Sequence, residues 1–298
     1  MFVILFTMGF TIKELETLSG IKAHTIRIWE QRYQFLKPLR TNTNIRTYSN
    51  DELKEILTVS LLHKYGYKIS HIDKMHPQQR QSEVLRLQEE EARLEYEVNK
   101  LVGSMIDMDI AGFENGLNEH IQRNGLSKTV TTVVFSFLEK VGILWHTSRI
   151  HPAHEHIVSN IIRQKIIAAI DALPQPSNDK PLHLLFLPEE AYHELGLLFV
   201  SFLLKEKGIP LIYLGANVPM QDVAYVMQQK KPLFLYVHLT SIPHKLNVPK
   251  FITTLGEASY HYNVVLSGSI TDNYKKTLPQ NISFCKSFSE VLAYISSH

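Results

Sequence analysis

The sequence predicts a multidomain protein with α and α/β parts: a winged helix-turn-helix, a four-helix bundle, and a doubly wound parallel sheet of the Rossmann-like, flavodoxin type. Three observations predict this order. Two short amphipathic segments meet at Gly20 and precede a basic, Asn-rich stretch. Residues 79–175 repeat apolar side chains at helical spacing, whereas from residue 180 short apolar runs alternate with helical segments. We therefore expect domains at 1–78, 79–175 and 180–298.

The positive charge of the chain is concentrated at its N-terminal end. Residues 1–78 carry 11 Lys/Arg against 7 Asp/Glu (+4), residues 79–180 carry 11 against 14 (−3), and residues 181–298 carry 9 against 8 (+1). A nucleic-acid-binding surface is therefore expected in the first domain, if the chain has one.

Cysteine content and apolar run length indicate the compartment. The single cysteine, Cys285, excludes an internal disulfide framework and fits a reducing cytoplasm. Apolar runs stay below the ~18 residues that a membrane helix needs. The apolar start, Met1 to Phe10, lacks the basic region and small-residue cleavage site of a signal peptide. We interpret it as an extension, with Met8 as an alternative start.

The first domain begins with a helix-turn-helix pattern. Thr11 is a good N-cap and Glu14, three residues later, completes a capping box. Gly20 can take the left-handed turn that ends this helix. A second helix follows from Ile21, and in such motifs the second helix lies in the major groove of DNA. The Asn-rich stretch 41–47 predicts a small hairpin, or wing.

Two more helices are expected before the hinge. A capped helix starts at Ser49 and ends near Gly66, and a short helix covers Ile69 to Met75.

This head resembles the MerR family of winged-helix transcription regulators, most closely the CarH/LitR branch. The matching residues include Thr25, Ile26, Arg27, Trp29, Glu30, Arg32, Tyr33, Pro38, Arg40, Thr41, Arg46, Tyr48, Ser49, Leu53, Gly66 and Tyr67.

The resemblance implies a set of DNA-binding residues. Arg27 would reach the major groove or its phosphates, and contacts of this kind supply affinity more than sequence specificity. The full predicted set is Thr25, Arg27, Trp29, Tyr33, Arg40, Arg46 and Tyr48. Two alternatives stay open: Trp29 and Tyr33 as core aromatics, and Arg32 as a solvated surface charge.

Residues 77 to 180 predict a hinge followed by four helices. The polar run 77–81 is typical of a hinge, and the helices are joined by short connections, as in a bundle. The expected helices are Val84 to Val102, Ile110 to Gln122, Leu126 to Trp145 and Pro152 to about Leu173.

One spacing in the bundle resembles the Trp-x9-Glu-His motif of cobalamin-dependent photoreceptors of the CarH family. Trp145 is followed after nine residues by Glu155 and His156. The resemblance implies that Trp145 covers the upper face of the corrin and that Glu155 and His156 lie near the same ligand. It also implies that His146 can reach cobalt once an adenosyl group is lost. We interpret the extra histidines, His151 and His154, as surface residues.

The third domain alternates strands and helices. Its first strand is nearly all apolar, as expected for a parallel strand covered on both faces. In such sheets ligands bind beyond the carboxyl ends of the strands. The expected strands are Leu182–Leu187, Pro210–Leu214, Leu233–Leu239, Asn263–Leu266 and Ile282–Cys285, and the expected helices are His193–Lys207, Val218–Gln229, Pro249–Ser259 and Glu290–Ser296.

The loop after the first strand is similar to the cobalamin-binding signature (Asp or Glu)-x-His-x-x-Gly. The resemblance makes His193 the lower axial ligand of cobalt and lets Gly196 bring the helix close to the corrin tail. Imidazole is a good ligand, and a carboxylate normally orients it. Here Ala191 stands at the acidic position, and Glu190, one residue earlier, is a possible substitute.

Two further strand-end loops fit the same resemblance. Thr240, in the loop after the third strand, and Gly268, after the fourth, would line the nucleotide tail. The family has a Gly-Gly pair where this chain has Ser267 and Gly268, and a side chain at Ser267 crowds the base of the tail. The alternative for both loops is ordinary turn chemistry. A nicotinamide or flavin site is not favoured, because no Gly-x-Gly-x-x-Gly follows the first strand.

The resemblance covers most of the chain and implies a cytoplasmic transcription regulator, a repressor, that binds inverted repeats in double-stranded DNA as a homodimer or homotetramer. Cobalamin, most simply adenosylcobalamin, would control its assembly, with light releasing the DNA. A second hypothesis keeps DNA binding but gives control to a partner protein or another ligand, because Ala191 and Ser267 depart from the signature. A third is a corrinoid-dependent methyltransferase or mutase module, which the DNA-binding head argues against.

Overall fold

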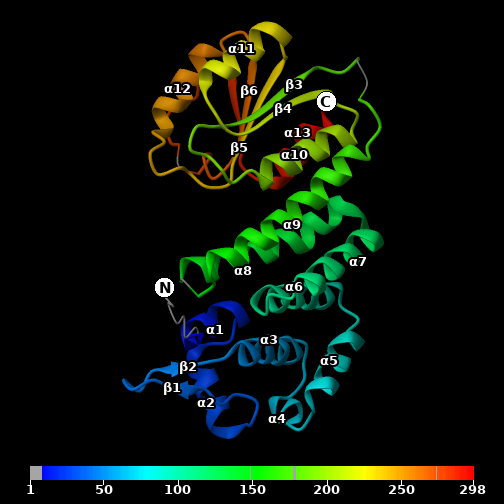
Figure 1. Ribbon diagram of the computed structural model, residues 1–298, viewed down its shortest axis with the longest axis vertical. Helices are drawn as coiled ribbons and strands as arrows, with labels where there is room; N and C mark the ends of the chain where they lie inside the picture. The colour runs from blue at the N-terminus through cyan, green and yellow to red at the C-terminus, as the bar shows by residue number, and fades with distance from the viewer. Residues whose placement is uncertain (1–8, 148, 177–178, 273) are drawn as a thin grey trace, which may run out of the picture. The chain divides into compact units, whose positions relative to one another are not determined.

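A computed structural model describes residues 9–147, 149–176, 179–272 and 274–298 (Figure 1). The chain forms two compact units, Met1–Ile161 and Ile162–His298. Residues 1–8 of the apolar start, with the two candidate initiators Met1 and Met8, lie outside the described residues, whereas Phe10 is buried and pairs with Tyr48. Across the ranges given above, every helix is too short or too polar to cross a bilayer.

The first unit opens with the expected winged helix-turn-helix. Both bonds of the capping box form, Glu14 N–H to Thr11 Oγ1 at 3.4 Å and Thr11 N–H to Glu14 Oε2 at 2.6 Å. Gly20 ends the first helix with φ 73°. The elements are α1 (Ile12–Ser19), α2 (Ala23–Arg32), β1 (Leu39–Arg40), β2 (Arg46–Thr47), α3 (Asn50–Lys64) and α4 (Ile69–Ile72). Strands β1 and β2 pair antiparallel and form the wing.

The predicted hinge at 77–81 is wrong: this stretch begins a helix, α5 (Pro77–Arg86). Proline is favoured in the first turn of a helix, where its missing N–H costs nothing. The break comes later, before α6 (Glu90–Ile106), because Leu87 leaves the helical region at φ −61°, ψ 133°. Its side chain is buried, and its carbonyl accepts a 3.1 Å bond from Arg93 Nε. The single long helix expected from Val84 is therefore two helices.

The helical region continues with α7 (Ile110–Thr129), a π-helical turn η1 (Val130–Val134), α8 (Phe135–His146) and α9 (Pro152–Asp171). Gly125 interrupts α7 with φ 77° and ψ 164°, a backbone conformation that is essentially restricted to glycine. The chain resumes its helix at once, so the predicted stop at residues 124–125 is a kink. Two phenylalanines of this region, Phe113 and Phe137, pack with ring centroids 5.2 Å apart and are almost fully buried.

The second unit contains a parallel sheet of five strands in the order β4-β3-β5-β6-β7 (Figure 1). This order is the flavodoxin type, so the predicted fold class is confirmed. Helices α10 and α13 lie on one face of the sheet and α11 and α12 on the other. The elements are β3 (His183–Pro188), α10 (Leu195–Glu206), β4 (Leu211–Val218), α11 (Met220–Lys230), β5 (Phe234–Leu239), α12 (Val248–Ala258), β6 (Asn263–Gly268), β7 (Ile282–Cys285) and α13 (Phe288–Ser296).

This topology defines where a ligand is expected. Strand order reverses between β3 and β5, since β3 is followed along the chain by β4 on one side and then by β5 on the other. In open parallel sheets the crevice beyond the carboxyl ends of such a pair is the usual ligand site.

A buried histidine at the amino end of β3 makes the stability of this unit sensitive to acid. His183 has no exposed surface; Pro181 O lies 2.9 Å from its Nδ1 and the Tyr294 hydroxyl 2.8 Å from its Nε2. Burial lowers the pKa of His183 from 6.5 to about 4. The unfolded chain therefore takes up a proton first as pH falls, and stability is lost between these two values.

We predict that His183→Gln makes stability less dependent on pH. Between pH 7 and pH 4.5 the wild-type protein should lose on the order of 3 kcal/mol through His183, whereas the variant should not lose this contribution. Urea unfolding of the full chain at both pH values measures the difference, with the exposed His261→Gln as control. Equal losses in wild type and variant would contradict the assignment.

Candidate functional site

The DNA-facing candidates of the head lie on α2 and the wing. Arg27 is exposed on α2, and Thr25, two residues earlier on the same helix, is partly exposed. On the wing, exposed Arg40 donates a 2.7 Å bond from NH1 to Asn44 Oδ1. Tyr33 is partly exposed just beyond α2. These side chains are available to a phosphate backbone, as their predicted role requires.

Two of the predicted DNA-binding aromatics belong to the core instead. Trp29 is 5% exposed and packs edge-on against Phe35 and His63. Tyr48 is fully buried and donates its hydroxyl to Glu30. Burial argues against direct DNA contact by either ring, and it resolves the alternative left open for Trp29.

Glu30 joins the helix and the wing from within. Its second oxygen, Oε2, lies 2.8 Å from Arg46 Nε, so one carboxylate holds both Tyr48 and Arg46. Burial and the Glu30 bond raise the pKa of the Tyr48 phenol, which keeps it a neutral donor. Sequence matching included Glu30 in the motif but gave it no role. The geometry shows that it fixes the position of Arg46 at the base of the wing.

We predict that different residues of this head support its stability and its DNA binding. Tyr48→Phe should cost about 1–3 kcal/mol of stability, because it leaves the Glu30 carboxylate one partner short. Arg27→Ala and Arg40→Ala should leave the unfolding temperature almost unchanged but lower the slope of log affinity against log salt by about 1 each. Thermal unfolding and salt-dependent gel shifts measure both, with Arg123→Ala, outside the head, as control. A large loss of stability in the arginine variants would contradict this division.

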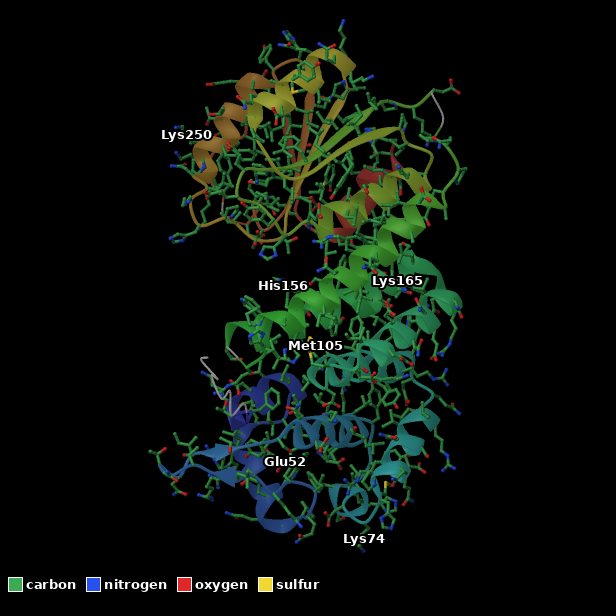
Figure 2. All side chains as sticks on the ribbon, viewed as in Figure 1. Glu52, Lys74, Met105, His156, Lys165 and Lys250 are labelled. Atoms are coloured by element: carbon green, nitrogen blue, oxygen red, sulfur yellow. The ribbon has the colours of Figure 1, made fainter. Side chains whose placement is uncertain are left out.

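The second group of candidates lies at the end of α8 and the start of α9. Trp145 is 42% exposed, unusually high for this side chain. Glu155 accepts a 2.5 Å bond from Ser159 and lies 3.1 Å from Nδ1 of His156, whose side chain is exposed (Figure 2). A carboxylate that orients an imidazole in this way raises its basicity as a ligand. The side chain of His146 lies outside the described residues.

The segment between these candidates is tied to the DNA-binding head. Arg149 Nε lies 2.7 Å from Glu14 Oε1 and its NH1 donates to Gly9 O at 3.2 Å. Glu14, whose side chain is only 6% exposed, is the same residue that caps α1. Nearby, Lys140 of α8 donates to Leu18 O of α1 at 3.3 Å.

Neither cation was singled out in the sequence, because no local pattern links positions more than a hundred residues apart. Lys140 also donates to Asn99 at 2.7 Å, and burial lowers the pKa of its ammonium group. The cation at residue 140 lies at the C-terminal end of α1, where the helix dipole favours positive charge.

The third group surrounds a cavity of about 240 Å³ at the carboxyl ends of β3 and β5. His193 lines it from the loop after β3, and Thr240 from the loop after β5. The His193 side chain is exposed and makes no hydrogen bond among the described residues. An imidazole with both ring nitrogens uncommitted, at the switch point of the sheet, can bind a metal as an axial ligand.

Among the described residues, no hydrogen bond joins a carboxylate to the His193 ring. Ala191, at the acidic position of the signature, is buried. The possible substitute, Glu190, is engaged elsewhere, because its Oε1 accepts a 2.8 Å bond from Lys245 and its backbone N–H bonds to Asn217. Glu194 is also committed, to Tyr213 at 3.0 Å and to Arg163 at 3.1 Å. Glu190 lines the same cavity as His193 but bonds to Lys245, so its service in place of the motif acid stays a prediction.

Gly196 and Gly268 both have close approaches, Gly196 to the His238 side chain and Gly268 to the Leu239 backbone, whose carbonyl oxygen would lie 2.3 Å from a Cβ. A Cβ on Gly196 would lie 2.4 Å from His238 Cδ2 and 3.2 Å from Thr240 Oγ1. Gly268 has φ 82°, and a Cβ there would lie 3.4 Å from His238 Cε1. His238 Nδ1 is 2.9 Å from Ser267 Oγ. The sequence assigned this loop to the ligand and did not anticipate that His238 would fill the space itself.

The residues therefore fit a corrinoid in part. In the second unit, the exposed His193 lines the cavity and suits an axial ligand of a corrin ring. In the first unit, taken by itself, Trp145 is exposed and Glu155 lies against His156. The two-glycine space that the resemblance assigns to the nucleotide tail holds His238 instead.

Comparisons with known proteins match two separate segments of the chain. Residues 10–79 match the model of the MerR HTH family regulatory protein, and residues 97–169 match that of the B12 binding domain. The HTH-type transcriptional repressor CarA of Myxococcus xanthus is 30% identical over 230 residues, which cover 76% of this chain and 74% of CarA. The chain belongs to the CarA family of MerR-type transcriptional repressors. This CarA-family chain is a transcription regulator and not an enzyme.

One further relative and one solved structure are also similar to this chain. The repressor CarH of the same organism is 27% identical to this CarA-family chain over 224 residues, which cover 73% of the chain and 74% of CarH. The monomethylamine corrinoid protein of Methanosarcina barkeri shares the fold with a TM-score of 0.55 at 14% identity, over 67% of this chain and 97% of its own. The last likeness concerns the fold alone.

Proposed function

We propose that this CarA-family chain represses transcription by binding inverted repeats in double-stranded DNA, and that a cobalamin controls its assembly into homodimers or homotetramers. The ligand we propose is the adenosyl form, with light ending DNA binding. One observation carries the proposal: Arg149 joins α1 of the DNA-binding head to the segment between Trp145 and His156. A ligand bound at that segment thus has a physical route to the head.

The strength of this route follows from its burial. Glu14 is nearly enclosed and serves both the Thr11 cap and Arg149. A hydrogen bond between charged groups contributes about 1.5–3 kcal/mol, and more is lost when one partner is left alone in a buried place. Such an energy is enough to shift a two-state equilibrium by about tenfold or more, provided that the ligand favours one state.

The proposed roles of the ligand-binding residues are as follows. His193 would hold the cobalt from the lower face, Trp145 would cover the upper group, and Glu155 and His156 would contact the ligand beside it. His146 would be a second cobalt ligand after loss of the upper group. Gly196, Thr240 and Gly268 would contact the side of the ligand that faces the sheet. When bound, an adenosylcobalamin supplies a cobalt–carbon bond that light can break.

A second candidate function rests on His193. Because this imidazole bonds to no carboxylate among the described residues, its affinity for cobalt should be lower, and loss of such a partner typically costs ~10–100-fold. A regulator of the same family with a sensor unit controlled by a partner protein or another ligand would show the same geometry.

One experiment decides between the two candidates. The purified full-length protein is incubated with adenosylcobalamin in the dark, freed of excess ligand, and examined by visible absorption, size-exclusion chromatography and gel shift before and after illumination. We predict a retained corrin spectrum, a larger assembly in the dark, and loss of DNA binding in the light. His193→Ala should weaken ligand binding by about tenfold or more, whereas His261→Ala should not. A protein that retains no corrin spectrum would support the second candidate.

A further inference from the structure

Two glycines leave a space beside the proposed corrinoid site. Gly196 is in the first turn of α10, and Gly268 ends β6. The ring of His238, at the carboxyl end of β5, lies against both positions. A methyl group on Gly196 would come within 2.5 Å of His238 Nε2, a distance that atoms do not tolerate. Gly196 is therefore needed here to admit this ring, whereas Gly268 is needed for its φ of 82° and its close approach to the Leu239 carbonyl.

His238 is held in this place by a hydrogen bond and by its surroundings. Its Nδ1 bonds to Ser267 Oγ at 2.9 Å, and Ser267 itself is buried at 1% exposure. Burial lowers the pKa of His238 from 6.5 to about 4, so the ring is neutral at physiological pH and packs without a charge to solvate.

The space below His238 is also filled. Tyr236 is two residues earlier on β5, so its side chain projects from the same face of the strand. It is fully buried, and its hydroxyl makes no hydrogen bond of good geometry among the described residues, although Ser267 lies beside it. A bulky group that entered beside Gly196 would have to displace His238. Interiors packed in this way resist extra atoms.

We propose that His238 closes the channel for a nucleotide tail, so that this protein selects corrinoids that lack the nucleotide base, the cobinamide class, over complete cobalamins. This inference rests on the proposed corrinoid site and specifies its ligand. The ring end of the ligand still meets His193, which is exposed in the cavity at the carboxyl end of β3. The nucleotide base of a complete cobalamin would meet the His238 side chain in the place where the cobalamin-binding signature has space for the nucleotide tail.

The same packing predicts how the channel could be opened. Serine at position 238 and glycine at position 267 would together remove the imidazole and its hydrogen-bond partner, while leaving both flanking glycines in place. The two substitutions free the volume that the imidazole and the serine hydroxyl now fill. Affinity for a corrinoid without the base should hardly change, because such a ligand does not use this space.

The test compares two probes, adenosylcobinamide and adenosylcobalamin, titrated in the dark into the full-length protein and followed by visible absorption and equilibrium dialysis. The wild type should bind adenosylcobinamide about tenfold or more tightly than adenosylcobalamin, in line with the cost of overfilling a packed interior. In the double variant His238→Ser with Ser267→Gly, the ratio should move toward adenosylcobalamin by about the same factor. Release of the cobalamin's own base from cobalt costs the same free energy in both proteins. The change in the ratio of the two affinities between wild type and variant therefore reports the effect of the channel alone. The exposed His261→Ser is the matched control and should keep the wild-type ratio.

The outcomes separate this inference from the proposed function. Wild-type protein that binds adenosylcobalamin as tightly as adenosylcobinamide overturns the inference and leaves the proposed function standing. A wild-type preference that the double variant, folded as judged by circular dichroism, does not change also overturns it. Failure of wild type and variant to bind either probe removes the proposed corrinoid site itself. If the double variant does not fold, the single variant His238→Ser takes its place, and equal binding of the two probes by the wild type still overturns the inference.

Discussion

The Glu14 carboxylate is the group on which the coupling in the first unit depends. One oxygen accepts the N-cap bond of α1 and the other faces Arg149, so the start of the helix-turn-helix and the loop after Trp145 share a single buried acid. Lys140 reinforces the same junction from α8. Because the acid is nearly enclosed, it cannot exchange Arg149 for water without a cost. Any change in the loop therefore reaches α1.

The surroundings of two histidines, His193 and His238, define the proposed ligand site of the second unit. His193 is exposed, and among the described residues its two neighbouring carboxylates bond elsewhere, Glu190 to Lys245 and Glu194 to Tyr213 and Arg163. His238 is partly buried and bonded to Ser267. The first is free to meet a metal, and the second occupies the place of a ligand's tail. Both features depart from the cobalamin-binding signature, and together they describe a site with a narrower choice of ligand.

Local rules predicted much of the fold. The capping box at Thr11, the turn at Gly20 and the apolar runs of the five strands are short-range signals, and each element formed close to its expected bounds. The break at Leu87 was missed because burial of one leucine, a tertiary effect, outweighed a continuous helical pattern. In the site, His193 was found through its motif, whereas Arg149 and His238 act through partners distant in sequence. Only the folded chain reveals such partners.

A ligand bound near Trp145 should change the stability of α1 through the contact between Arg149 and Glu14. Hydrogen exchange of the α1 amides, measured on full-length protein with and without adenosylcobinamide or adenosylcobalamin in the dark, tests it most directly. We expect bound ligand to change the hydrogen-exchange protection of the α1 amides in the wild type and in the exposed Lys13→Gln control. In Arg149→Gln the corrin spectrum should be retained, but the protection of α1 should no longer change. A wild type that binds the corrinoid yet shows unchanged exchange in α1 would contradict the account.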